Sequence, residues 1–224
     1  ENTEGEYSGA GGRVHPKLPQ EVGIDVSVFT RDGIERVMRY AFELALTRPK
    51  KQLTLVTKSN AQRHGMVLWD EVFEKLKHDY PGITTDRMLV DAITTRMVLQ
   101  PQSLDTIVAT NLHADILSDL AAALSGSLGI GPTANINPER TFPSMFEPIH
   151  GSAFDLVGKD LANPLGAFWS CVMMLEHLQE KKGASLLMSA IEEVCQEGRH
   201  LPKDLGGNSC TGEVTTAVCA ALKK

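Results

Sequence analysis

The sequence lacks the features that are typical of membrane proteins, of secreted proteins and of small domains held together by a structural metal ion or by disulfides. No apolar run approaches the roughly 18 residues that a membrane-spanning helix needs. The opening ENTEGEYSGAGG has neither the basic nor the apolar region of a signal peptide. The four cysteines form no CxxC pair, which favours reduced thiols over a zinc site or a disulfide framework. We therefore expect a cytoplasmic protein that does not bind membranes.

An excess of basic residues is also absent. The chain has 22 Lys and Arg against 28 Asp and Glu, a net charge of -6 and a pI near 5.7. The basic residues are dispersed rather than gathered in a stripe, so binding to nucleic acid through its phosphates is not expected. An acidic protein that binds an anion needs local basic groups or a metal ion.

The chain has no initiator methionine and begins at Glu1 inside a polar, turn-rich stretch. We interpret it as a fragment of a longer protein. Its 224 residues, of which 42% are hydrophobic, are enough for one large domain or two modest ones.

Strands and helices alternate along the first half of the chain. Apolar residues recur at period two in residues 21–30, and at spacings of three and four in the helix that starts at Thr30. Three further strands are expected at 53–57, 87–92 and 105–110. A helix is expected over residues 64–79, and further helices should follow the strands at 87–92 and 105–110. This rhythm is typical of an α/β fold in which helices layer a sheet.

The second half begins with a stretch dense in Gly, Pro and Asn, residues 126–143, and a domain boundary is expected near residue 125. Three helices are predicted after it, at about 162–180, 184–198 and 211–222.

Polar residues follow the predicted strands. Because ligands gather at the carboxyl ends of strands in open α/β sheets, these residues should converge: Lys58, Asp91, Asn111, Asp115 and Asp119. Asp115 and Asp119 are four apart on a predicted helix and share a face. Taken singly, an Asp near a helix start more often stabilises the helix dipole. Three Asp together with a Lys favour a site for Mg²⁺ or Mn²⁺.

The stretch MFEPIHGSAFDLVGKDLANP, residues 145–164, is too polar for a core strand and too rich in turn residues for a helix. We interpret it as a functional loop. His150 could instead cap a turn, and Asn163-Pro164 could be a plain helix entry. No GxGxxG motif is present, and GSLGIG is too weak to replace one.

These residues resemble a known family. ENTEGEYS, TKSN, VDA, NLHADILSDL and FEPIHGSAFDLVGKDLANP occur in the order and spacing of the metal-dependent β-decarboxylating dehydrogenases, the isocitrate/isopropylmalate dehydrogenase family. The resemblance covers the whole chain, and NPERTFPSMFEPIHGSA and VFTRDGIERVMRYAFELA are similar to the tartrate/D-malate branch. It implies an isopropylmalate dehydrogenase-like layered sheet-and-helix fold, incomplete at its N-terminus.

The resemblance also implies an active site. Lys58 becomes the general acid/base for the substrate hydroxyl, and Tyr7 the proton donor to the enolate left by decarboxylation. The metal carboxylates are Asp91, Asp115 and Asp119, for Mg²⁺ or Mn²⁺. The possible supporting residues are Asn60, Asn111 and Glu147. Members of the family share active sites within a homodimer, with Lys58 and Asp91 reaching into the partner's cleft.

For the cofactor, the resemblance implies that His150, Gly151, Ala153, Asp155 and Asn163 hold the adenosine half of NAD. Asp155 would accept hydrogen bonds from the ribose diol and repel a 2′-phosphate, which selects NAD over NADP.

By the same resemblance, residues 1–125 are the remainder of a dimerisation and metal-binding domain, with an arm at about 7–25. Residues 126–224 are the C-terminal part of a large NAD-binding domain. The expected activity is NAD-dependent oxidation and decarboxylation of a small 2-hydroxy diacid of the D-malate or tartrate type. Alternatives are an isocitrate or related dehydrogenase of the same family, or a noncatalytic regulatory or truncated subunit. The family's front section is missing, so this chain alone should be inactive.

Two positions depart from the branch. His113-Ala114 stands where an aromatic residue and a Gly are common, and Phe154 where Pro is common. We interpret His113 as a packing or supporting residue rather than a metal ligand, because carboxylates suffice for the metal.

Overall fold

A computed structural model describes residues 4–223, so the first three residues of the ENTEGEYS motif lie outside the described part. The chain divides into two compact units, residues 1–118 and 119–224. The division falls within a helix rather than in the Gly-rich stretch after residue 125. The roles predicted for residues 1–125 and 126–224 stay predictions.

The first unit is built on a three-stranded parallel sheet in the order β4-β3-β5. The strands are β3 (Gln52–Thr57), β4 (Thr84–Leu89) and β5 (Thr106–Val108). The central strand β3 is almost wholly buried, including Thr54 and Thr57. The α/β fold class is thus confirmed.

Helices α1 (Arg31–Thr47) and α2 (Gly65–Leu76) enclose the core of this unit together with β3. Phe42 of α1 stacks on Phe73 of α2, with ring centroids 5.4 Å apart. Leu53 and Leu55 of β3 belong to the same core. Because strand residues alternate between faces, Val56 points to the other side of the sheet, where α3 (Val90–Leu99) packs.

Helix α1 starts where the sequence predicts. The Thr30 hydroxyl accepts a hydrogen bond from the Gly33 amide at 3.1 Å, and the Glu4 carboxylate accepts from the Thr30 amide and hydroxyl at 3.1 and 2.7 Å. A Cβ on Gly33 would lie 2.3 Å from the Glu4 carboxylate. A side chain at position 33 would therefore displace the Glu4 carboxylate from the positive end of the helix.

One strand ends earlier than expected. The prediction of a strand over 87–92 is wrong at its C-terminus, because β4 stops at Leu89 and α3 begins at Val90. Leu89 pairs with Thr57, the last residue of β3, so the ladder runs out there. Asp91 consequently lies in the first turn of a helix.

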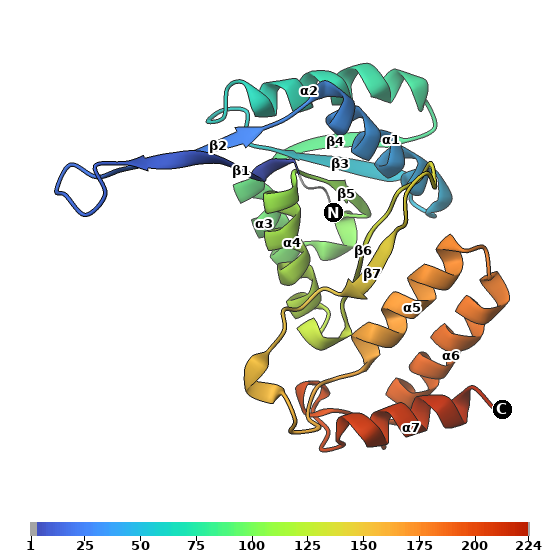
Figure 1. The fold of residues 1–224 in the computed structure, drawn as a ribbon. Coiled ribbons are helices and arrows are strands. Elements are labelled where there is room, and N and C mark those ends of the chain that lie inside the picture. The colour runs from blue at the N-terminus through green and yellow to red at the C-terminus, as the bar shows by residue number, and fades with distance from the viewer. Residues whose placement is uncertain (1–3, 224) are drawn as a thin grey trace. The chain divides into compact units, whose positions relative to one another are not determined.

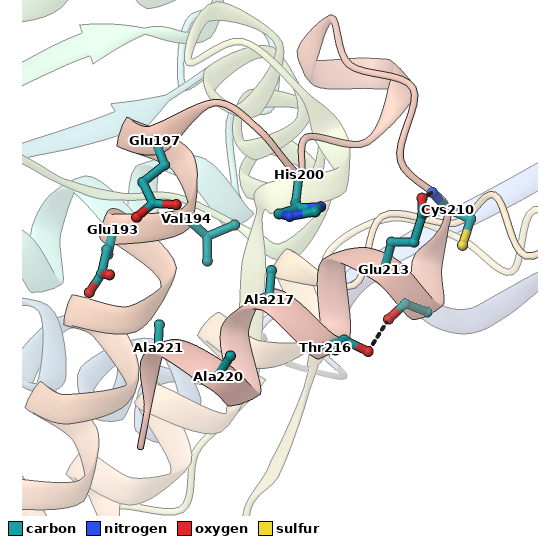
Figure 2. A pocket seen from close by; sticks show the side chains of 11 residues that line it. Glu193, Val194, Glu197, His200, Cys210, Glu213, Thr216, Ala217, Ala220 and Ala221 are labelled. Atoms are coloured by element: carbon teal, nitrogen blue, oxygen red, sulfur yellow. Dashed lines mark hydrogen bonds between the residues drawn. The ribbon is translucent and has the colours of Figure 1, made fainter. Parts of the chain in front are cut away.

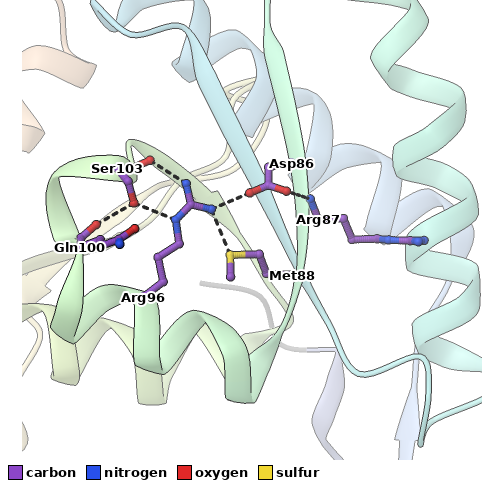
Figure 3. A network of polar contacts seen from close by, with 6 residues as sticks. All are labelled: Asp86, Arg87, Met88, Arg96, Gln100 and Ser103. Carbon is purple, nitrogen blue, oxygen red and sulfur yellow. Dashed lines mark hydrogen bonds and ion pairs between the residues drawn. The ribbon is translucent and has the colours of Figure 1, made fainter.

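Arg96 anchors α3 to the neighbouring segments (Figure 3). Its guanidinium donates to Asp86 of β4 at 2.6 Å, and to the hydroxyl and carbonyl oxygens of Ser103 at 2.7 and 3.0 Å. The Arg96 side chain is 22% exposed, so these charge-assisted bonds are partly shielded from water. They fix the helix that carries Asp91.

An antiparallel hairpin of β1 (Gly5–Val14) and β2 (Val22–Val28) projects from the first unit (Figure 1). It includes the predicted arm at about 7–25. Every residue of β2 is exposed, and so are the apolar side chains of the hairpin: Val14, Leu18, Val22, Ile24, Val26 and Val28.

Helix α4 (Asn111–Leu124) carries both Asp115 and Asp119 and spans the division between the units. The second unit contains a short hairpin, β6 (Pro132–Asn135) and β7 (Met145–Pro148), which the sequence analysis did not predict. Its helices are α5 (Leu165–His177), α6 (Lys181–Glu197) and α7 (Thr211–Ala221), and a second core forms among them. These three helices agree with the predicted ones. Within residues 4–223, no helix is both long and apolar enough for a membrane span.

Candidate functional site

Lys58 and Asp91 form an ion pair at the carboxyl edge of the sheet. Lys58 directly follows β3, and Asp91 lies in the first turn of the helix that follows β4. The Lys58 ammonium group, which donates a hydrogen bond to Asp91, lowers the pKa of that carboxyl below its ordinary value. The convergence predicted from strand ends therefore occurs for these two residues.

Tyr7 and Asp115 form a second pair. The Tyr7 hydroxyl on β1 donates to Oδ2 of Asp115 on α4 at 3.3 Å. Asp119 lies one helical turn further along α4 and shares a face with Asp115. In the described part of the chain, no three His, Cys, Asp or Glu side chains gather into a group that could hold a metal ion. The Lys58–Asp91 and Tyr7–Asp115 pairs therefore form within one chain. The three predicted metal carboxylates do not come together within one chain.

The three possible supporting residues differ in their surroundings. Asn111 is buried and ties α4 to the start of β1: its amide donates to the Glu4 carbonyl at 2.5 Å, and its oxygen accepts from the Leu112 amide at 2.9 Å. Asn60 is exposed just after β3, and Glu147 is exposed on β7. Asn111 thus has a structural role of its own.

His113 is buried beside these pairs, with 7% of its surface exposed. Its backbone amide donates to the Thr110 hydroxyl at 3.4 Å, and that hydroxyl donates to Glu6 at 2.9 Å. Nδ1 of His113 and Oε2 of Glu6 are both buried without a hydrogen-bond partner among the described residues. Burial lowers the pKa of His113, the positive charge of Lys58 lowers it further, and the negative charge of Glu6 opposes both.

A cavity of about 1040 Å³ lies in the second unit. Four of the five residues predicted to bind the cofactor line it: His150, Gly151, Ala153 and Asn163. Asp155 does not line the cavity in the described structure, although it lies in a short 3₁₀ turn between Ala153 and Leu156, which do. Ala153 has φ of 41°, a left-handed conformation that turns the loop sharply at the cavity wall.

His150 and Asn163 have local partners as well. Nδ1 of His150 lies 3.0 Å from the carbonyl oxygen of Gly151, and because a carbonyl accepts, Nδ1 carries the proton. The side-chain oxygen of Asn163 accepts from the Leu165 amide at 2.9 Å at the start of α5. Asn163 thus lies at a helix entry, as one alternative from the sequence expected, and it also lines the cavity.

Asp204, which was not predicted from the sequence, also lines the cavity. Its Oδ2 accepts from the Ser127 hydroxyl, and from the Asn163 amide at 2.9 Å. A Cβ on Gly129 would lie 2.5 Å from the same oxygen. The one signal for Asp204 was its place in the turn-rich stretch PKDLGG, which gives no hint of contacts with residues 41 and 77 positions earlier.

A second cavity of about 620 Å³ lies between α6 and α7 (Figure 2). Three carboxylates line it together with alanines of α7 that include Ala217 and Ala220. His200 and Cys210 also line it, as the same view shows. None of the residues predicted to be functional lines this cavity.

The sequence profile of the isocitrate/isopropylmalate dehydrogenase family matches residues 1–220. The chain belongs to this family of α/β enzymes.

Within the family, the chain is similar to a probable tartrate dehydrogenase/decarboxylase of Agrobacterium vitis, with 65% identity over 99% of the chain and 62% of the relative. It is 49% identical to the decarboxylating D-malate dehydrogenase of Escherichia coli, over 99% of the chain and 63% of that protein. The solved structure of isocitrate dehydrogenase from Methylococcus capsulatus matches with a TM-score of 0.93 and 39% identity, over 100% of this chain and 66% of that one. The chain thus spans less than two thirds of the length of its relatives.

The donor chemistry of the described residues suits the groups that this family implies, although the three predicted carboxylates do not gather within one chain. Asp115 and Asp119 present carboxylate oxygens, the donors that Mg²⁺ and Mn²⁺ prefer, on one face of α4. The cavity in the second unit has the volume of a cofactor site, and Asn163 and Asp204 offer polar groups there.

The burial of His113 predicts a pH dependence of stability. The unfolded chain takes up a proton near the ordinary pKa of 6.5, whereas the folded chain resists protonation to lower pH. The free energy of unfolding should therefore fall as the pH drops below 6.5. His113→Phe removes this pH-dependent part of the free energy of unfolding. As the pH falls from about 7.5 to 5.5, the variant should therefore become more stable relative to the wild type. Urea unfolding of both proteins measures the difference, and a difference that does not change with pH would contradict the prediction.

Proposed function

We propose that the chain belongs to a metal-dependent, NAD-linked dehydrogenase that oxidises and decarboxylates a small 2-hydroxy diacid of the D-malate or tartrate type. The observation that carries the proposal is the pairing of Lys58 with Asp91 and of Tyr7 with Asp115, because each pair joins a proton-transfer group to a predicted metal carboxylate. The names of the relatives at 65% and 49% identity support the substrate class.

Lys58 acts as the general base for the substrate hydroxyl. An ammonium group cannot accept a proton, so the ion pair with Asp91 must open and Lys58 must lose its proton first. Asp91, Asp115 and Asp119 would hold the divalent ion. When bound, that ion would stabilise negative charge on substrate oxygens, while NAD would accept the hydride.

Tyr7 acts after carbon dioxide has left. Its hydroxyl proton, which points to Asp115 in the described structure, is redirected to the carbon of the enolate. Asp115 accepts a hydrogen bond from Tyr7 and so keeps the hydroxyl close to the carboxylates on α4. The two proton transfers thus fall to different groups.

The proposed site needs a second copy of the chain. Lys58 and Asp91 would reach into the cleft of a homodimer whose partner provides Asp115 and Asp119. The ion pair places Lys58 and Asp91 as a unit at one edge of the sheet, so they can enter that cleft together. The exposed apolar row of the hairpin supplies a surface for the association.

The first test separates the half-reactions in the full-length enzyme. Lys58→Met should abolish oxidation of the hydroxy acid but spare most decarboxylation of the corresponding 2-keto acid, because the ketone no longer needs a base. Tyr7→Phe should impair proton delivery after decarboxylation, and Asp115→Asn both half-reactions. Loss of a general acid or base typically costs about 10²–10⁴-fold. Equal losses in both half-reactions for Lys58→Met would refute its role.

The second test concerns coenzyme choice. Asp155→Lys removes the proposed acceptor for the ribose diol and supplies a cation for a 2′-phosphate, so NAD binding should weaken and NADP binding improve. Asp155→Asn is the matched control that removes the charge alone and should affect NAD more than NADP. Calorimetric affinities for both dinucleotides are the measurement. If Asp155→Lys keeps the wild-type preference for NAD over NADP, Asp155 does not contact the ribose.

The third test is the oligomeric state. Ile24→Lys places a charge in the apolar row of β2 and should shift the dimer towards monomer. Asp25→Lys introduces the same side chain at the next position, on the opposite face, and should leave the dimer largely intact. Sedimentation velocity at micromolar concentration distinguishes the two. A folded wild-type monomer at that concentration would overturn the shared site.

A further inference from the structure

Asn163 is held on both sides of its side-chain amide. The oxygen accepts from the Leu165 amide at 2.9 Å, and the nitrogen donates to Oδ2 of Asp204 at 2.9 Å. The Leu165 amide only donates, and an ionised carboxylate only accepts. The orientation of the Asn163 amide is therefore fixed by chemistry and not by convention.

A reversed Asn163 amide would be disfavoured twice. Its nitrogen would then face the Leu165 amide, donor against donor, and its oxygen would face the Asp204 carboxylate, acceptor against acceptor. Of these two groups, the Asp204 carboxylate lies outside the chain segment of Asn163 and comes from the 3₁₀ turn Lys203–Leu205. Asp204 is itself held by the Ser127 hydroxyl and closed in by Gly129.

The fixed amide still has capacity for a ligand. A primary amide has two N–H donors and two lone pairs on oxygen, so one of each remains after the bonds to Asp204 and Leu165. The N–H and C=O of an amide match the edge of adenine, whose amino group donates and whose N1 accepts. Hypoxanthine presents the reverse, because its O6 accepts and its N1 carries a proton.

We propose that Asp204 is a positioning residue that fixes the amide of Asn163 and thereby makes the cavity selective for adenine over hypoxanthine. The inference rests on the proposed function and on the predicted contact of Asn163 with the adenosine half of NAD. Asp204 lies 41 positions after Asn163 in the chain and would act on the ligand only through the Asn163 side chain.

The experiment compares the affinities of the full-length protein for NAD and for nicotinamide hypoxanthine dinucleotide by calorimetry. The wild type should prefer NAD by about tenfold or more, the discrimination of a bidentate amide–base pair. Asp204→Asn should reduce this preference by about threefold or more, because a neutral amide at position 204 can face either end of Asn163. Asp204→Glu, which retains the carboxylate, should restore most of the preference.

Asp160→Asn is the matched control. Asp160 also lines the cavity, but its carboxylate accepts from the Gly212 amide at 3.2 Å rather than from Asn163. It can alter both affinities, yet it should leave their ratio unchanged. A merely structural role for Asp204 would likewise lower both affinities equally and leave the ratio alone.

The outcomes separate the inference from the proposed function. If the wild type binds neither dinucleotide, the cofactor site itself is wrong. If it binds both equally, or if folded Asp204→Asn keeps the wild-type ratio, the cofactor site stands and the positioning role of Asp204 is overturned. Circular dichroism and a cooperative thermal transition establish that each variant is folded.

Discussion

The parallel pairing of β3 with its neighbours is the constraint on which the first unit depends. Thr57 at the end of β3 pairs with Leu89 at the end of β4, so the chain leaves both strands at one edge. Lys58 and Asp91 emerge there and meet although 33 positions separate them in sequence. The core of α1, α2 and β3 stabilises this register, since a shift by one residue would turn Leu53 and Leu55 away from it.

Periodicity and burial predicted much of this arrangement. The stretch LTLVT in β3, the period-two pattern of β2 and the helical spacing of α1 each identify their elements, because the pattern is local to the segment. The end of β4 could not be predicted, because it depends on where β3, its neighbour in the sheet, ends and no longer offers backbone groups for pairing. The short strands β6 and β7 were also missed, because four residues within a stretch rich in Gly and Pro carry too little pattern.

The candidate site shows the same division. Lys58, Asp115 and Asn163 were predicted because they stand at strand ends, at helical spacing or in a recognisable motif. Asp204 has none of these, and its part in the cavity comes from a fold that joins residues 127, 163 and 204. Such contacts are absent from any local pattern, so a single sequence gives no route to them.

Asn163 illustrates why structural and functional readings of a residue need not compete. Its oxygen satisfies the Leu165 amide at the start of α5, which is one of the otherwise unpaired donors of a helix N-terminus. That bond and the bond to Asp204 together remove the freedom of the amide to flip. The same two contacts that serve the fold thus prepare a donor and an acceptor of known order at the cavity wall. An amide that made neither contact could rotate to suit either adenine or hypoxanthine. It would then discriminate little between the two bases.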